Sequence, residues 1–505
     1  MRAWIVTVFA LLMGTPALAA APDTDSIKAI LGAARDAWHA PGIAAAVVRD
    51  DKVFYLGGVG VRELGDDAPV TANTLFPIGS CTKAFTATAL AVLVDDGKAD
   101  WDDPVRKHLP GFRLDDPLAD RDVRLRDLLC HRIGLARHDL LWYRAPWSIE
   151  ESVRRMAYLE RSTSFRSTFE YNNLAYLAAG LSIAAIAKQP WHEFVHERLF
   201  KPLKMNHVVF TSGEARKAPD HASPHGHGGG KVIAIPWYND DKQIRASGSI
   251  KASVSDLSHW LRFQLAGGKF DGERVVSANA LEETHTGQKT VEKMSAAARA
   301  AEAIQVNYGL GWYISEYRGH GILEHGGAVD GFRARIVLVP REKLGLVVLT
   351  NLEDMEIVNA AGNNLLDHLL GLEKKDWNAF FTEEHKKTET ARRDRLEKRR
   401  RERVRGTKPK REYEAYAGTY CEPAYGTVKV RLDDEKLILK WSSFEFPLEH
   451  FHYETFLPQP RKERLPEALR EATILFEMDE GPDITSLRFL GRTFRREKVP
   501  NGREK

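Results

Sequence analysis

Helical and strand-like patterns of hydrophobic and polar residues alternate along the first part of the chain. Apolar residues from Ser26 to Trp38 recur at helical spacing, which predicts an amphipathic helix. The short apolar runs 42–48 and 53–61 are joined by the polar residues 49–52 and predict a hairpin of two strands. A second helix is predicted from about Ser80 to Gly97, because its apolar positions form one broad face and a glycine ends it.

A long helical region separates this hairpin from a second group of strands. Polar turns interrupt the helical periodicity between residues 101 and 203. Strands are then predicted at Gly309–Tyr317, Arg333–Pro340 and Leu344–Asn351, followed by a closing helix at Val358–Leu370. This order favours an α+β domain over residues 25–375, in which helices flank an antiparallel sheet and a helical subdomain is inserted between the sheet halves.

The C-terminal part of the chain has a different pattern. Residues 376–411 are predicted to form a basic linker or solvated helix, since the stretch 385–411 has fourteen Lys/Arg, four Asp/Glu and almost no apolar stripe. Residues 428–432 and 437–441 then alternate apolar and polar positions, and further short runs follow. This spacing predicts a small antiparallel barrel or sandwich over residues 412–505, and we favour the barrel.

The N-terminus bears on where the protein works. Residues 1–19 contain one arginine, an apolar run from Ala3 to Met13 and a small-residue pattern at Ala17–Ala19, which together predict a signal peptide cleaved after Ala19. That run is shorter than the roughly 20 residues that span a bilayer, and no later segment is long and apolar enough to do so. An uncleaved anchor or a buried helix is the alternative. We therefore expect a periplasmic or secreted protein with no transmembrane segment after cleavage.

The composition is that of an ordinary globular protein. Hydrophobic residues make up 43% and charged residues 28%, and the net charge is +3. Because the basic stretch 385–411 lies in an otherwise acidic chain, this charge predicts no nucleic-acid partner; binding of that stretch to nucleic acid or an anionic surface is the alternative. Cys81, Cys130 and Cys421 are too few for a disulfide framework. A Cys81–Cys130 bridge is conceivable, but free buried thiols are favoured.

Ser80-Cys81-Thr82-Lys83 is the only S-x-x-K in the chain, and it opens the second predicted helix. At about 1.5 Å rise per residue, Lys83 lies one turn beyond Ser80 on the same face. The helix N-terminus also brings free N–H groups and partial positive charge beside the serine oxygen. Lys83 can act as the base that activates Ser80 only if burial or a second cation lowers its pKa far below the usual value of about 10.4. A capping Ser and an ordinary helical Lys would give the same pattern.

Two further clusters contain groups suited to proton transfer and amide binding. Tyr171 can share proton transfer with Lys83, since a neighbouring ammonium favours phenolate, and Asn173 can hold a substrate amide by donating and accepting. The cluster His325-Gly326-Gly327-Ala328 leads into a strand, and its two glycines allow close approach of a ligand backbone. The N–H groups of Ala328 and Ser80 would form an oxyanion hole. Taken singly, a Tyr and Asn at a helix start and a turn histidine are common.

Together, the three clusters resemble the ordered motifs of the penicillin-binding-protein and serine β-lactamase superfamily. S-x-x-K at Ser80–Lys83, Y-x-N at Tyr171–Asn173 and [KH]-[TG]-G at His325–Gly327 follow that family's order. The resemblance covers roughly residues 25–370 and is similar to the class C β-lactamase-related branch. The further stretches that resemble this branch are 127–135, 194–205, 308–313 and 347–351. Residues 413–420 resemble the opening of the lipocalin-like β-barrel that follows this domain in some members.

The resemblance implies roles for matching residues. Ser80 would be acylated while Lys83 and Tyr171 move protons; the substrate would be bound by Asn173, His325, Gly327 and Ala328. His325 stands where many relatives have Lys, so it would bind a carboxylate only when protonated or through neutral hydrogen bonding. No residue that activates a deacylating water is evident.

We therefore expect an exported serine hydrolase, similar to S12-type peptidases and DD-peptidases, that forms an acyl-enzyme and acts on D-amino-acid-containing peptides. A β-lactamase or carboxylesterase of the same fold is the alternative. The substrate is a peptide or small molecule, no cofactor or metal is expected, and assembly into homo-oligomers stays open.

Two other histidine clusters suggest different chemistry. His192-Glu193-Phe194-Val195-His196 is an H-E-x-x-H, the signature of zinc proteases. A third ligand is not evident, because Glu214 lacks the flanking pattern of such enzymes, and chance placement is favoured. His221, His225 and His227 lie in a glycine-rich stretch that forms a solvated loop, a lid or an adventitious metal site. A binding protein with a decayed site is a third class, against which the intact motifs argue.

Overall fold

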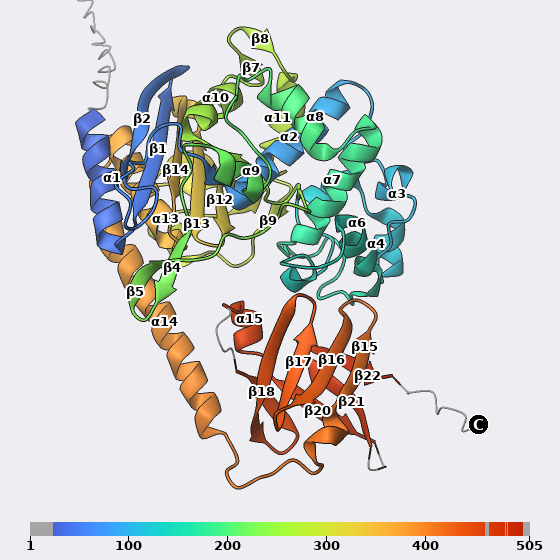
Figure 1. Cartoon of the computed structure of the whole chain (residues 1–505). Helices are drawn as coiled ribbons and strands as arrows, with labels where there is room; N and C mark the ends of the chain where they lie inside the picture. Colours follow the sequence, from blue (N-terminus) through green and yellow to red (C-terminus); the bar gives the residue numbers. More distant parts are fainter. Residues whose placement is uncertain (1–23, 460–463, 480, 482, 498–505) are drawn as a thin grey trace, which may run out of the picture.

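The computed structural model describes residues 24–459, 464–479, 481 and 483–497 of the chain (Figure 1). The predicted signal peptide lies outside these residues. A large domain and a smaller barrel are connected by one long helix, α14 (Trp377–Arg401). Within the described residues, no helix is long and apolar enough to cross a membrane.

An eight-stranded antiparallel sheet forms the centre of the large domain. In spatial order its strands are β2 (Lys52–Gly60), β1 (Gly42–Arg49), β14 (Leu344–Thr350), β13 (Phe332–Val339), β12 (His320–Val329), β11 (Tyr313–Tyr317), β10 (Asn307–Tyr308) and β9 (Lys289–Thr290). The N-terminal hairpin joins the later strands through β1 and β14, where Ile43 lies opposite Thr350. The predicted α+β fold, with a sheet assembled from two distant parts of the chain, is confirmed.

Strand β12 is the main strand that the sequence pattern did not predict. Glycines and histidines, such as Gly321, Gly326 and His325, interrupt any apolar alternation along it. Conversely, residues 309–312 were expected to extend a strand, but they connect β10 to β11. The pairing of β12 with β13 on one side and β11 on the other is therefore a tertiary effect.

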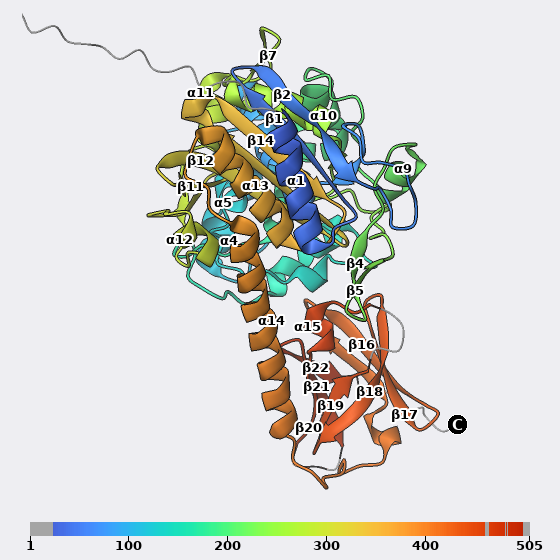
Figure 2. The same ribbon diagram turned by 90° about the vertical axis from the view of Figure 1, so that its left-hand side faces the viewer.

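Helices cover both faces of the sheet. α1 (Thr24–Trp38) and α13 (Met355–Leu370) pack on one face, and α10 (Val254–Leu265) packs on the other (Figure 2). Strand β1 is apolar at successive positions because its alternate side chains belong to different cores: Ala44 and Ala46 face one, and Ala45 and Val47 face the other.

A helical subdomain is inserted between β3 (Phe76–Pro77) and β6 (Lys251–Ala252), which pair with each other. Its helices are α2 (Thr82–Asp95), α3 (Val105–His108), α4 (Pro117–Asp122), α5 (Leu125–Leu129), α6 (Ile149–Arg154), α7 (Asn173–Ala187), α8 (Trp191–Val195) and α9 (Ser212–Lys217). The hairpin of β4 (His225–Gly228) and β5 (Lys231–Ala234) also lies in this part of the chain, and β7 (Lys269–Phe270), β8 (Glu273–Arg274), α11 (Ala278–Thr284) and α12 (Ala296–Ala300) follow α10.

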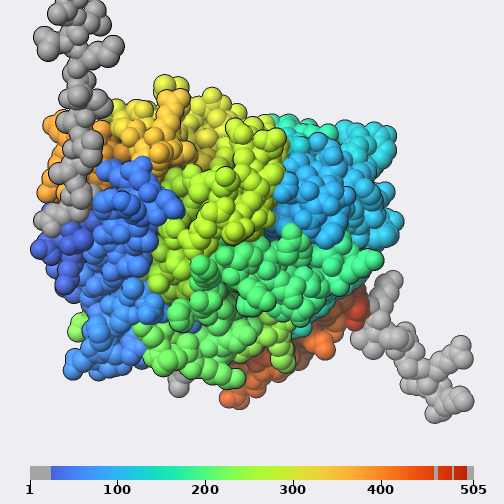
Figure 3. Space-filling view, turned by 90° about the horizontal axis from the view of Figure 1, so that it is seen from above, coloured from blue at the N-terminus to red at the C-terminus, as the bar shows by residue number. Residues whose placement is uncertain are grey.

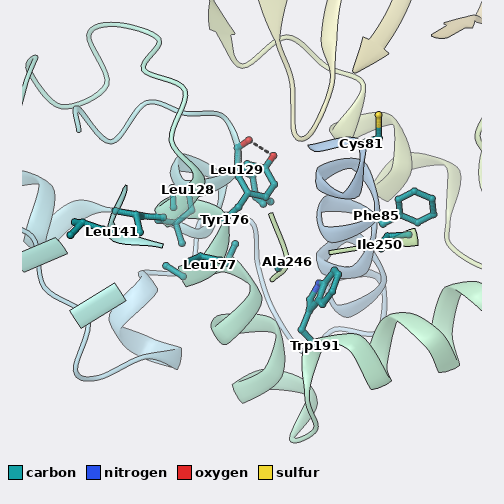
Figure 4. Close-up of a cluster of buried hydrophobic side chains, with 14 of the residues drawn as sticks. Cys81, Phe85, Leu128, Leu129, Leu141, Tyr176, Leu177, Trp191, Ala246 and Ile250 are labelled. Carbon is teal, nitrogen blue, oxygen red and sulfur yellow. Dashed lines mark hydrogen bonds between the residues drawn. The ribbon is translucent and has the colours of Figure 1, made fainter. Parts of the chain in front are cut away.

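Helices α2 and α7 pack together in the core of this subdomain. Phe85 on α2 and Leu177 on α7 are buried, and the Tyr176 hydroxyl donates a hydrogen bond to the Leu129 carbonyl at 2.6 Å (Figure 4). This packing fixes the start of α2 relative to the start of α7, which are the two places where sequence motifs were found. Cys81 and Cys130, also in this core, are free buried thiols, as favoured from the sequence.

The C-terminal domain is a closed antiparallel barrel, which confirms the barrel over the sandwich; its likeness to lipocalins stays a prediction. Its strands are β15 (Gly418–Glu422), β16 (Gly426–Asp433), β17 (Lys436–Trp441), β18 (Phe444–His452), β19 (Thr455–Pro458), β20 (Ile474–Met478), β21 (Ile484–Phe489) and β22 (Arg492–Arg496), with a short helix α15 (Glu467–Arg470) between β19 and β20. Seen from above, the large domain hides most of this barrel (Figure 3).

The basic segment joins the two domains as a largely solvated helix. Helix α14 starts in the large domain, where Trp377 and Phe381 are buried, and its exposed C-terminal half runs beside the barrel (Figure 1). There Arg392 and Arg395 form ion pairs with Glu471 at 2.8 and 2.9 Å. Part of the positive charge is thus used in contacts with the barrel.

One buried carboxylate organises the loop between α6 and α7. Asp127 is fully buried and accepts from Arg132 Nε at 2.5 Å and from Arg166 Nη2 at 2.6 Å. The backbone of Arg166 donates to the Arg132 carbonyl at 2.8 Å, and that of Glu170 donates to the His131 carbonyl at 2.8 Å. Asp127 therefore anchors the segment that leads into Tyr171.

We expect Asp127→Ala to lower the free energy of unfolding by about 3 kcal/mol, because two arginines would lose their buried partner. Urea unfolding followed by circular dichroism measures the change. Asp122→Ala is the matched control, since the Asp122 pair with Arg121 lies at the surface and should contribute nothing measurable. Equal stability of the Asp127→Ala variant and the wild type would show that the arginines do not depend on this carboxylate.

Candidate active site

Ser80 lies in a short 3₁₀ turn, Gly79–Cys81, that leads directly into α2. Lys83 follows one turn later and is completely buried. Its Nζ lies 3.2 Å from Ser80 Oγ, 2.7 Å from Asn173 Oδ1 and 2.9 Å from the Ser247 carbonyl oxygen. Ser80 and Lys83 of the S-x-x-K motif are therefore in contact. Asn173 and Ser247 supply two further hydrogen-bond acceptors for the Lys83 amine.

The protonation state of Lys83 follows from these surroundings. Burial holds the pKa of Lys83 well below its usual range, and the Arg137 guanidinium lowers it further, while Asp139 opposes the shift. A neutral amine has two N–H groups and one lone pair. Its N–H groups can donate to Asn173 and Ser247, which leaves the lone pair to accept the Ser80 proton.

Tyr171 faces the same pair but is a neutral phenol. Burial raises its pKa above the usual value, the nearby Tyr313 adds to this effect, and the interactions with Ser80 and Arg137 only partly offset it. The expectation that a neighbouring ammonium would favour phenolate is therefore wrong, because burial dominates and keeps Lys83 itself neutral. Lys83 Nζ lies 4.9 Å from the centre of the Tyr171 ring. A phenol in this position can donate a proton rather than remove one.

Asn173 begins helix α7 and has both ends of its amide engaged. Its Oδ1 accepts from Lys83 at 2.7 Å, and its Nδ2 donates to Asp139 Oδ1 at 2.8 Å. The sequence suggested that Asn173 holds a substrate amide. In the structure it orients Lys83, and a substrate would have to replace the bond to Asp139.

Two glycines allow strand β12 to pack directly against the nucleophile turn. A Cβ on Gly327 would lie 1.8 Å from the Ile78 carbonyl oxygen and 3.2 Å from the Ser80 amide nitrogen. A Cβ on Gly79, whose φ is +52°, would lie 2.6 Å from the Ala328 amide nitrogen. The backbone amides of Ser80 and Ala328 are thus neighbours, as an oxyanion hole requires.

His325 is buried and carries no charge at neutral pH. Burial and the proximity of Lys83 lower the pKa of His325 to about 3. Its Nδ1 lies 2.6 Å from the Gly326 carbonyl, which can only accept, so Nδ1 carries the proton. Its Nε2 then accepts from the Tyr308 hydroxyl at 3.0 Å. Both ring nitrogens are engaged, so His325 does not offer a cation to a substrate carboxylate.

Sequence reasoning missed several contributors to this site. Arg137 and Asp139 lie shortly after the stretch 127–135, which resembles the family, and Tyr308 is the first residue of the similar stretch 308–313. All three residues are therefore close to a recognisable motif. Ser247 contributes only its backbone carbonyl, and no side-chain pattern could have indicated it.

Two cavities meet at Ser80, and Arg137 and Ala328 also line both. The barrel-side cavity has a volume of about 610 Å³ and is lined by Trp142, Tyr143 and Tyr238 of the large domain and by Tyr425, Leu465 and Leu490 of the barrel domain. The second cavity, of about 510 Å³, runs along β12 toward α12 and is lined by Tyr171, Tyr313, Val291, Met294 and His325. The barrel therefore forms one wall of the space around Ser80.

The H-E-x-x-H segment does not form a metal site in the described residues. The rings of His192 and His196 pack against Phe210 and Phe200. Glu214 accepts from the backbone of Thr211 and caps α9. The single group of His and carboxylate ligands found in the described part of the chain is Asp354, Glu356 and His385, elsewhere on the domain.

The other histidines are also engaged separately. His225 is buried between the Asn351 carbonyl and the Leu64 amide. His227 pairs with Asp354 at 2.5 Å, and His221 bonds the Ala218 carbonyl at 2.7 Å. They stabilise the β4–β5 hairpin and its surroundings and do not converge on one point.

Gly327→Ala should slow the reaction of Ser80 with a fluorophosphonate probe by about 10²-fold or more, because the new methyl group forces β12 away from Ser80 and removes an oxyanion donor. The rate of labelling measures this directly. Gly321→Ala, on the same strand but with open space around its Cβ, is the control and should react at the wild-type rate. Wild-type reactivity of Gly327→Ala would show that the close approach is not needed.

The pKa of His325 predicts a pH dependence of stability. Below about pH 6.5 the unfolded chain gains a proton on this histidine, whereas the folded protein does not until about pH 3. Stability therefore falls as the pH drops through this window. Between pH 7 and pH 5 we expect the loss in free energy of unfolding to be about 2 kcal/mol smaller in His325→Gln than in the wild type, by urea unfolding at both pH values. The same loss in both proteins would mean that the ring protonates in the folded state.

Two known protein families match most of the chain. A family model for beta-lactamase matches residues 27–371, and a model for a domain of unknown function matches residues 402–499. The unguisins hydrolase of Aspergillus campestris is 28% identical over 501 residues, covering 89% of this chain and 86% of that protein.

Solved structures share the fold. The octameric penicillin-binding protein homologue from Pyrococcus abyssi has a TM-score of 0.62 at 22% identity and covers 94% of this chain and 99% of its own. The D-stereospecific amidohydrolase from Streptomyces sp. has a TM-score of 0.56 at 22% identity and covers 70% of this chain and all of its own, 100%.

Proposed function

Because the chain belongs to the beta-lactamase family, we propose that it is an exported serine hydrolase that forms an acyl-enzyme on Ser80 and cleaves amide bonds in D-amino-acid-containing peptides. The observation that carries this proposal is the buried Lys83 amine, which contacts Ser80, Asn173 and Ser247 and is held neutral. A neutral lysine beside a serine hydroxyl is a base in the position where acyl transfer needs one.

The residues support a balanced acylation step. As Ser80 Oγ bonds to the substrate carbonyl carbon, its proton passes to Lys83 Nζ, and the negative carbonyl oxygen is stabilised by the amides of Ser80 and Ala328. The C–N bond then breaks, and the departing nitrogen takes a proton from the Tyr171 hydroxyl. Lys83 returns its extra proton to Tyr171. Water then cleaves the Ser80 ester, with Lys83 again as the base.

The shape of the site favours an extended peptide. Strand β11 pairs with β12 only as far as Glu324, so residues 325–329 have no strand partner on that side among the described residues. A peptide backbone can add to such an edge. The aromatic wall of the barrel-side cavity suits a bulky apolar side chain. The D-configuration rests on the name of the Streptomyces amidohydrolase, which has the same fold.

Export and assembly belong to the same proposal. Export rests on the signal-peptide pattern of residues 1–19. Self-association is suggested by the octameric state named for the Pyrococcus abyssi homologue, whose likeness covers nearly the whole of this chain. Intact mass of the protein from a periplasmic or culture fraction would show whether cleavage follows Ala19.

A D-aminoacyl p-nitroanilide and its L-enantiomer test the function. We expect the wild type to release p-nitroaniline at least ten-fold faster from the D-enantiomer, and Ser80→Ala to lose roughly 10³-fold or more in kcat/KM. Intact mass after incubation with benzylpenicillin should show one adduct on the wild type and none on Ser80→Ala. Full turnover by Ser80→Ala would exclude the acyl-enzyme, and preference for the L-enantiomer would exclude the proposed substrate class.

A further inference from the structure

The site lacks a cation where its His-Gly-Gly motif would supply one. His325 is neutral, and both its ring nitrogens are engaged. Most other cations that line the two cavities are neutralised by a neighbour: Arg144 by Asp330, Lys251 by Asp240, Arg335 by Glu324 and Arg464 by Glu353. Arg137 is also paired, with Asp139, but it lines both cavities where they meet beside Ser80, whereas Arg245, Lys293 and Arg470 each line only one.

The Arg137 side chain is 58% exposed, and its ion pair with Asp139 is made through Nε. Its Nε donates to Asp139 Oδ2 at 2.7 Å, and its guanidinium carbon lies 4.9 Å from the centre of the Tyr171 ring. Within the described residues, neither Nη atom has a hydrogen bond. The planar pair of N–H donors that matches a carboxylate is thus available.

Asp139 positions Arg137 and is itself held by hydrogen bonds from two other side chains. Asp139 Oδ1 accepts from Asn173 Nδ2 at 2.8 Å and from Trp142 Nε1 at 2.9 Å, so its carboxylate is fixed by the site and by the cavity wall. The residue between the two, His138, adopts a φ of +45° and bonds the Tyr425 hydroxyl of the barrel at 2.9 Å. Large domain and barrel together fix the segment that presents the guanidinium.

We propose that Arg137 recognises a carboxylate of the substrate next to the scissile bond, through the Nη atoms that the Asp139 contact leaves free. This inference rests on the proposed function. The ligand class is a peptide with a carboxylate on the leaving side, supplied either by its C-terminus or by an acidic side chain. Arg137 is then a specificity-determining residue that contacts the Tyr171 ring and lines both cavities beside Ser80.

Three matched substrates test the inference: an N-acylated D-dipeptide with a free C-terminal carboxylate, the same peptide as its C-terminal amide, and an amide whose leaving residue is D-Glu. The measured quantity is the ratio of kcat/KM for each acid to that for the neutral amide, by mass spectrometry of the released residue. Any effect of Arg137 on the pKa of Lys83 acts on all three substrates and cancels in this ratio.

We expect the wild type to prefer a carboxylate substrate, and Arg137→Gln to lower the ratio about ten-fold or more, since a charge-assisted hydrogen bond is lost. Arg137→Lys should keep part of the preference. Whichever acid shows the effect identifies the source of the carboxylate. Arg154→Gln is the control: Arg154 is likewise exposed and paired with one acid, Glu151, but lies outside both cavities, and it should leave the ratio unchanged.

An unchanged ratio for both acids in Arg137→Gln would overturn the inference while leaving the proposed function intact. Failure of the wild type to cleave any of the three peptides, with no benzylpenicillin adduct on Ser80, would overturn the proposed function and this inference with it.

Discussion

The site depends on the burial of one amine. Lys83 Nζ is removed from water and contacts Ser80, Asn173 and the Ser247 carbonyl, and none of the described carboxylates touches it directly. An unpaired ammonium would be very costly in such a place, so the neutral form is favoured. The packing of α2 against α7 brings these groups together, so the core of the helical subdomain fixes the geometry of the candidate site.

The same burial sets the chemistry of the surrounding groups. Tyr171 stays a phenol and His325 a neutral imidazole, since each is buried in a cluster of aromatic rings that disfavours charge. Lys83, Tyr171 and His325 are therefore proton donors or acceptors rather than ions. Positive charge lies instead at the edge of the site, where the Arg137 side chain is 58% exposed.

The barrel domain forms part of the cavity beside Ser80. Its Tyr425 and Leu465 line the cavity beside Ser80, and Arg155 of the large domain donates to the Ala424 carbonyl at 2.8 Å. A hydrolase site that is otherwise open becomes bounded on one side, which limits the groups that fit next to the scissile bond. The basic helix α14 connects the two domains and is itself bound to the barrel through the ion pair of Arg392 with Glu471.

The sequence by itself indicated the α+β class and the three clusters at Ser80, Tyr171 and His325, favoured a C-terminal barrel, and predicted a basic linker or solvated helix, because periodicity and short motifs are local properties. It could not predict strand β12, because glycines interrupt the apolar alternation along this strand. One of them, Gly327, allows the strand to contact the turn at Gly79. Nor could it show that Asn173 accepts a hydrogen bond from Lys83, that burial raises the pKa of Tyr171, or that Arg137 lines both cavities beside Ser80. Those facts depend on desolvation and on contacts between residues far apart in the chain, and only the packed tertiary structure decides either.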